Sequence, residues 1–111
     1  MDIRDRRSGQ ERRGTKRFMV ERDVEWQSSQ GKFPGSMSDV NLDGCFILSS
    51  GDVTDGEVVA VSVPMTDGTT AEFSGVVANH VFEIGFGVKF DTLSPTQRDL
   101  LFKIVRDFEA S

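Results

Sequence analysis

Two short polar motifs in this 111-residue chain have the residue types needed to bind an anionic ligand. The first, at residues 12–17, reads Arg-Arg-Gly-Thr-Lys-Arg and places Arg13 and Arg17 four residues apart. Residues at that spacing share a face in an extended segment and in a helical turn, so both guanidinium groups can converge on one ligand. A guanidinium forms paired hydrogen bonds with phosphate oxygens or with guanine O6 and N7, and it stacks on bases. By itself, the motif is also consistent with a solvated basic segment, because arginine is frequent around it.

The second motif, at residues 39–44, reads Asp-Val-Asn-Leu-Asp-Gly. The Asp39 carboxylate can accept hydrogen bonds from the N1–H and N2–H₂ edge of guanine, and the Asn41 amide can donate and accept. Gly44 permits a tight turn or a close approach of backbone. Alone, this hexapeptide would be an ordinary turn between two strands. It begins 22 residues after Arg17, a separation that fits one strand and a turn, and the combination predicts a binder of anions and guanine.

The segment after Phe18 has the pattern of a small β-barrel. Short runs of β-branched and aromatic residues are separated by turn residues at intervals of roughly ten. Apolar residues mark individual strands, among them Val20, Val24 and Trp26 in the first, Phe46 and Leu48 in the third, and Val59, Val61 and Val63 in the fourth. Asp67-Gly68 is the clearest hairpin signal. Strands near 71–79 and 84–90 bring the expected number to about six.

The end of the chain is predicted to be helical. Ser94 is a typical N-cap residue, Pro95 suits the first helical position, and Gln97 completes a capping box. An apolar stripe follows on one face, made of Leu101, Ile104, Val105 and Phe108. We expect this stripe to cover the barrel; contact with a partner protein is the alternative. The fold class is therefore all-β, a six-stranded antiparallel barrel with a C-terminal α-helix.

Length and composition bound the remaining possibilities. A chain of 111 residues fits one domain that needs no disulfide or structural metal. Cys45, the single cysteine, cannot form an internal bridge and is expected to be a small buried apolar residue. His80, the single histidine, has no second ligand at metal-binding spacing. No segment resembles a signal peptide or a transmembrane helix, so we expect a cytoplasmic protein without membrane insertion. No set of residues indicates catalysis or a cofactor.

The charge is divided unevenly along the chain. Residues 1–22 hold eight Lys and Arg against four Asp and Glu, whereas residues 23–111 hold five against fourteen. The first segment has few apolar residues and cannot form a core, which predicts that residues 1–17 are a flexible basic arm and residues 18–111 the folded barrel with its helix. We call residues 1–17 the basic arm.

The two motifs and their setting resemble the PilZ domain family of bacterial receptors for cyclic di-GMP. Arg13 and Arg17 match the Arg-x-x-x-Arg motif of that family, and residues 39–44 match Asp/Asn-x-Ser-x-x-Gly except at Asn41. Residues 85–90, Gly-Phe-Gly-Val-Lys-Phe, resemble the closing strand of PilZ domains, and Leu93-Ser94-Pro95 resembles the start of their final helix. The resemblance spans about residues 11–106.

This resemblance implies a PilZ-type barrel and assigns roles to six residues. Arg13 and Arg17 would wrap cyclic di-GMP from the basic arm, while Asp39, Asn41 and Gly44 would hold it against the barrel. Arg12 directly precedes the Arg-x-x-x-Arg motif, at the position that the family associates with ligand stoichiometry. An arginine there resembles the type that binds two intercalated molecules. The family's outputs include flagellar motors, pili, exopolysaccharide synthesis and transcription, so a protein partner is implied.

Two alternatives come from other functional classes. An interaction module with the same fold would have lost nucleotide binding, with Asn41 in place of Ser as the sign of that loss. A nucleic-acid-binding barrel would use the basic arm on phosphates, but it should also have a basic body and exposed aromatic residues. Residues 23–111 are strongly acidic, so nucleic acid is not the expected partner.

Overall fold

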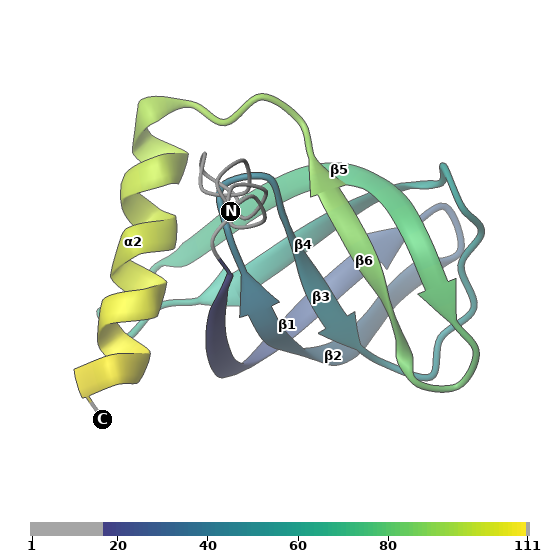
Figure 1. The fold of residues 1–111 in the computed structure, drawn as a ribbon, viewed down its shortest axis with the longest axis horizontal. Coiled ribbons are helices and arrows are strands. Elements are labelled where there is room, and N and C mark those ends of the chain that lie inside the picture. The colour runs from purple at the N-terminus through teal and green to yellow at the C-terminus, as the bar shows by residue number, and fades with distance from the viewer. Residues whose placement is uncertain (1–16, 111) are drawn as a thin grey trace, which may run out of the picture.

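The computed structural model of the chain describes residues 17–110, which form a closed barrel and one helix (Figure 1). The elements are β1 (Phe18–Ser28), β2 (Gly31–Val40), β3 (Gly44–Leu48), β4 (Val58–Pro64), β5 (Thr70–Val81), β6 (Gly85–Phe90) and α2 (Pro95–Ala110). The strands close in the order β1-β2-β3-β6-β5-β4, and every neighbouring pair is antiparallel. The predicted six-stranded antiparallel barrel with a C-terminal helix is confirmed.

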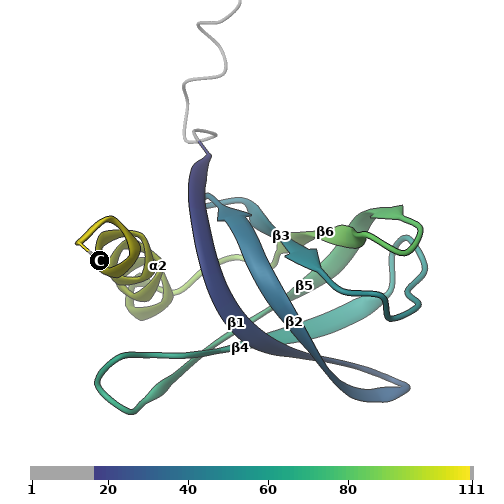
Figure 2. The ribbon, with the colours of Figure 1, turned by 90° about the horizontal axis from the view of Figure 1, so that it is seen from below.

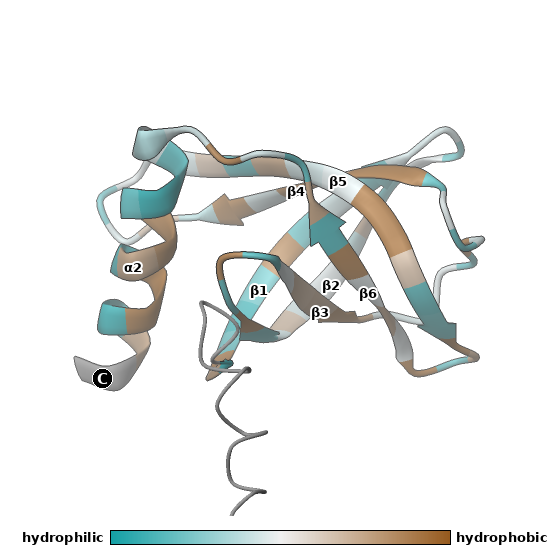
Figure 3. Cartoon of the chain, turned by 45° about the horizontal axis from the view of Figure 1, so that its top comes forward, coloured by the Kyte–Doolittle hydropathy of each residue, from teal (hydrophilic) through white to brown (hydrophobic). Residues whose placement is uncertain are grey.

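The core is filled by alternate residues of the strands, because successive side chains in a strand point to opposite faces. Figure 3 shows the alternation as changes between teal and brown along the ribbons. In β3 the buried residues are Cys45 and Ile47, whereas Phe46 is half-buried and Leu48 is exposed. The apolar residues that marked this strand in the sequence therefore lie on its outer face. Cys45 pairs with the buried Val40 of β2, and directly paired residues of antiparallel strands point to the same face, so Cys45 lies on the inner face.

Trp26 lies at the centre of the core and is fully buried. Its ring centroid lies 4.7 Å from that of Phe33 and 4.8 Å from that of Phe86, with the second pair edge to face. Gly51 leaves room for the indole, because a Cβ at that position would lie 2.5 Å from a ring carbon of Trp26. Aromatic pairs of this kind stabilise a core beyond the area that they bury. This cluster makes the barrel a rigid support for residues on its surface.

The capping box predicted at the start of the helix is present. The Ser94 hydroxyl accepts a hydrogen bond of 3.0 Å from the Gln97 backbone N–H, and the Gln97 side chain accepts one of 2.9 Å from the Ser94 N–H. Both bonds satisfy donors that a helix N-terminus leaves without partners. The helix α2 accordingly begins at Pro95.

The helix packs beside the barrel, next to β1 (Figure 2), and contacts β1 and β5. Leu101, Ile104 and Val105 are buried in this contact, while Phe108 remains 38% exposed. The expectation that the helix covers the barrel is confirmed for the first three residues of the stripe. No helix in the described part of the chain is long and apolar enough to cross a bilayer.

A polar contact ties α2 to the hairpin between β4 and β5. The Lys103 ammonium lies 3.2 Å from the Asp67 carboxylate, which also accepts hydrogen bonds from the hydroxyl and the backbone N–H of Thr69. These bonds, led by the one from the Thr69 hydroxyl, lower the pKa of Asp67 to about 2. Gly68 follows with a φ of +91°, which a glycine adopts without strain, so the predicted Asp67-Gly68 turn is confirmed.

Candidate ligand-binding site

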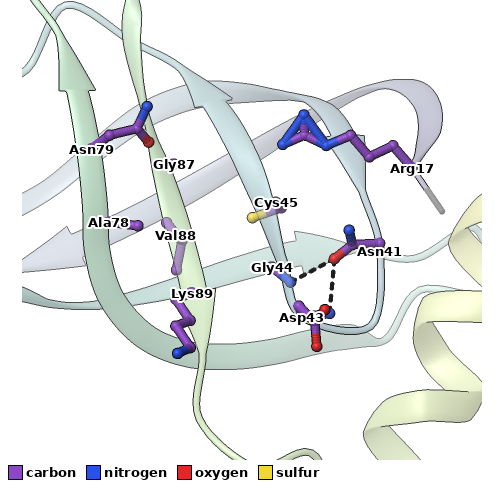
Figure 4. A pocket seen from close by; sticks show the side chains of 10 residues that line it. All are labelled: Arg17, Asn41, Asp43, Gly44, Cys45, Ala78, Asn79, Gly87, Val88 and Lys89. Carbon is purple, nitrogen blue, oxygen red and sulfur yellow. Dashed lines mark hydrogen bonds between the residues drawn. The ribbon is translucent and has the colours of Figure 1, made fainter. Parts of the chain in front are cut away.

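An open pocket of about 450 Å³ lies on the barrel surface where β6 meets the β2–β3 turn (Figure 4). Its walls come from the residue before β1, the turn at residues 41–44, and the facing parts of β3, β5 and β6. The lining residues are Arg17, Asn41, Asp43, Gly44, Cys45, Ala78, Asn79, Gly87, Val88 and Lys89. Three residues predicted from the sequence, Arg17, Asn41 and Gly44, therefore line one pocket.

The β2–β3 turn is shaped by the side chain of Asn41. The Asn41 Oδ1 atom accepts hydrogen bonds of 2.8 Å from the Asp43 N–H and 2.9 Å from the Gly44 N–H (Figure 4). The Asn41 N–H donates in turn to the Gly44 carbonyl at 2.9 Å. Asn side chains commonly support turns in this way, by bonding to backbone two or three residues later. The carbonyl oxygen of the amide is thus engaged in the turn that forms one wall of the pocket.

Gly44 has a packing role of its own. A Cβ at this position would overlap the carbonyl oxygen of Val88 on the neighbouring strand β6. A glycine here lets β3 and β6 approach each other closely at the floor of the pocket. Gly87 instead leaves room for a side chain, since a Cβ there would overlap the side-chain oxygen of Asn79. The close backbone approach expected at Gly44 is therefore present.

Arg17 and Asp39 bring the two sequence motifs into contact. The Arg17 Nη1 atom lies 3.8 Å from the Asp39 Oδ2 atom, and the side chains are 62% and 16% exposed. Asp39 lies on β2 beside irregularities in both of its pairings, with β1 between Met19 and Arg22 and with β3 between Met37 and Asp39. It does not itself line the pocket but adjoins it through Arg17. The positions predicted for Arg12 and Arg13 lie outside the described residues.

Sequence reasoning missed three polar residues that the fold adds to the pocket: Asp43, Asn79 and Lys89. Asp43 lies inside the second motif and could have been included on that ground. Lys89 is the single charged residue of β6. Its charge points to a place in the site only once β6 is known to adjoin β3, which carries the end of the second motif. Asn79 lies on β5, which also contains Thr70, Glu72 and Ser74, so a further polar residue there gives no sequence signal.

Cys45 borders the pocket but is chemically inert there. Burial, and after it the negative charge of Asp39, raises the pKa of the Cys45 thiol well above its ordinary value. A protonated, buried thiol is a poor nucleophile. This finding confirms the interpretation of Cys45 as a small apolar residue. Within residues 17–110, His, Cys, Asp and Glu form no group that could hold a metal ion.

Comparison with known proteins places the chain in a family. The family model of the PilZ domain matches residues 11–107, so the chain belongs to the PilZ domain family. No curated protein sequence matches the chain.

Two solved structures share its fold. One is the PilZ domain of CeSA from a cellulose-synthesizing bacterium, with a TM-score of 0.67, 15% identity, and 85% of this chain and 98% of that one covered. The other is the PilZ domain of YcgR from Escherichia coli with c-di-GMP, with a TM-score of 0.72, 16% identity, and 89% and 92% covered. At these identities the likeness concerns the fold.

Proposed function

We propose that this PilZ domain is a bacterial receptor for cyclic di-GMP and not an enzyme. The observation that supports the proposal best is the contact between Arg17 and Asp39 at the edge of a pocket. Arg17 and Asp39 are far apart in the sequence, and each suits one part of the ligand. Both lie at or beside the same surface pocket. The YcgR domain of like fold was solved with c-di-GMP, which favours the same ligand here.

The proposed ligand matches the chemistry of the six predicted residues. Cyclic di-GMP has two anionic phosphodiesters and two guanines, and arginine binds both kinds of group. We assign Arg13 and Arg17 to these groups, Asp39 to a guanine edge, and the turn of Asn41 and Gly44 to the wall that holds the ligand. Arg12 would neutralise a second, intercalated molecule.

The proposed mechanism couples ligand binding to ordering of the basic arm. The ligand would bridge cations of the arm and polar groups of the barrel, and the arm would then form a new surface against the barrel. A partner protein in the cytoplasm would recognise that surface, and the output would be motility, pili, biofilm formation or a related process.

A protein-interaction module without a nucleotide is the second candidate function. Exposed apolar side chains on the hairpin between β5 and β6 favour it, with Phe82 at 71% and Ile84 at 55% exposure. The Ile84 carbonyl accepts a hydrogen bond from the Ser49 N–H, and Leu48, itself exposed, pairs with Gly85. Contiguous exposed apolar surface commonly marks a protein-binding face.

Calorimetric titration with cyclic di-GMP tests the proposal, with GTP and cyclic AMP as controls. We expect heat of binding with cyclic di-GMP and none with GTP or cyclic AMP. The stoichiometry should be near two ligands per chain. A stoichiometry near one would contradict the role given to Arg12, and absence of heat would favour the interaction module.

A further inference from the structure

Lys89 lies between two adjacent pockets on the barrel surface. The first is the candidate ligand site, and the second, of about 370 Å³, is lined by Leu42, Asp43, Lys89, Phe90, Asp91, Thr92, Leu93 and Arg98. Lys89 and Asp43 line both. In Figure 4, Lys89 projects from β6 on the side of the pocket opposite Arg17 and Asn41. A ligand seated in the first pocket would therefore meet a cation on each side.

Lys89 has no counter-ion among the residues that the structure describes. Its ammonium makes no hydrogen bond or ion pair with any residue of the described range 17–110, unlike Lys103, which is paired with Asp67 at 3.2 Å. Residues 23–111 contain five Lys and Arg against fourteen Asp and Glu. Two of those five, Lys89 and Arg98, line this pair of pockets, so cations are concentrated there on an acidic body.

The Cα atom of Lys89 is held in place by strand pairing on both sides, unlike that of a loop residue. Lys89 pairs with Gly44 of β3 and with Val76 of β5, in the interior of the closed sheet. The backbone of β3 approaches it closely, because a Cβ on Gly44 would lie 3.3 Å from the Cα atom of Lys89. The ammonium therefore extends from a rigid strand, and only its four-carbon stem has freedom to adapt to a ligand.

We propose that Lys89 is a ligand-contacting residue that binds a phosphodiester of the nucleotide from the barrel side. The inference rests on the proposed function and adds a cation that neither sequence motif contains. An ammonium is a compact charge with three donors and suits phosphate oxygens, whereas a guanidinium also suits the flat edge of guanine. Lys89 thus anchors one phosphate on the rigid barrel, while the arginines of the basic arm engage the ligand from the other side.

Titration of cyclic di-GMP into four proteins tests this contact: the unmodified chain, Lys89→Ala, Lys89→Arg and Lys32→Ala. Lys32 is the matched control, because it is exposed on β2 and has no ion pair within residues 17–110. We expect Lys89→Ala to raise Kd about tenfold, as removal of a charge-assisted hydrogen bond does. Lys89→Arg should keep most of the affinity, and Lys32→Ala should bind like the unmodified chain.

Salt dependence separates a contact from a structural effect. Added salt screens the attraction between the ammonium and a phosphate, so Kd of Lys89→Ala should rise less with salt than Kd of the unmodified chain. Equal Kd values for Lys89→Ala and the unmodified chain, or an equal loss for Lys32→Ala, would overturn the contact and leave the proposed function standing. No binding by the unmodified chain would overturn both.

Discussion

The Arg17 guanidinium lies 3.8 Å from the Asp39 carboxylate, so each of these proposed ligand contacts serves as counter-ion to the other. A ligand that binds both must replace this ion pair. Arg17 is 62% exposed, and ion pairs at such exposure contribute about 0–1 kcal/mol to stability. The replacement therefore costs little, and the pair holds the two groups close together before the ligand arrives.

Substitution of Arg17 by Ala should weaken binding of cyclic di-GMP by about 1–3 kcal/mol, roughly ten- to hundredfold, because a charge-assisted contact is lost. Arg13→Ala should have a similar effect. Stability should change by about 1 kcal/mol or less, since the ion pair is exposed. Titration calorimetry and urea denaturation of the same preparations measure both quantities. Binding of either variant at the unmodified affinity would contradict the proposed site.

Substitutions of Asn41 distinguish its role in the β2–β3 turn from its proposed role in ligand binding. Asn41→Ala removes the acceptor of two backbone hydrogen bonds and should reduce the free energy of unfolding by about 1 kcal/mol. Asn41→Ser restores the residue typical of the family and keeps an oxygen that can support the turn, although more weakly. We expect this variant to lose less stability than Asn41→Ala and to bind cyclic di-GMP as well as the unmodified chain or better.

Denaturation and titration of the two Asn41 variants distinguish the roles. A large loss of affinity in Asn41→Ser, with stability nearly unchanged, would show that the site has adapted around the amide.

The sequence predicts local features of this protein better than features that depend on distant contacts. The capping box of Ser94 and Gln97 and the turn at Asp67-Gly68 involve neighbours in the chain, and both are present as predicted. Lys89 was missed because its place in the site depends on the pairing of β3 with β6, which are about forty residues apart. The outward orientation of Phe46 and Leu48, which marked the third strand in the sequence, likewise depends on how the β2–β3 turn sets the register.

Asp67 should make stability depend on pH in the acid range. Its pKa is lowered to about 2 in the folded protein, from an ordinary value near 4, so the ionised form is favoured by folding. The stability that it contributes is fully present above about pH 4–5 and is lost as the pH falls through about 2. The Asp67→Asn variant cannot ionise but keeps a carbonyl acceptor for Thr69.

Urea denaturation between pH 2 and pH 5 tests this behaviour. The difference in stability between the unmodified chain and Asp67→Asn should shrink as the pH falls, because protonation removes the charge that the variant lacks. Asp52→Asn is the control, since Asp52 is exposed in a loop and makes no hydrogen bond or ion pair within residues 17–110. A constant difference for Asp67→Asn across this range would contradict the assigned pKa.

Limited digestion with trypsin tests whether the ligand orders the basic arm. A polar segment with few apolar residues has little reason to fold alone, so we expect rapid cleavage of the free protein throughout the arm. Cyclic di-GMP should slow cleavage after Arg12, Arg13 and Arg17, whose side chains would be engaged. Cleavage after Arg4, Arg6 and Arg7 should remain unchanged. Mass spectrometry of early fragments separates these groups. Uniform protection would mean that the ligand gathers the whole arm or stabilises the protein globally, whereas binding without any protection would rule out ordering of the arm as the signal.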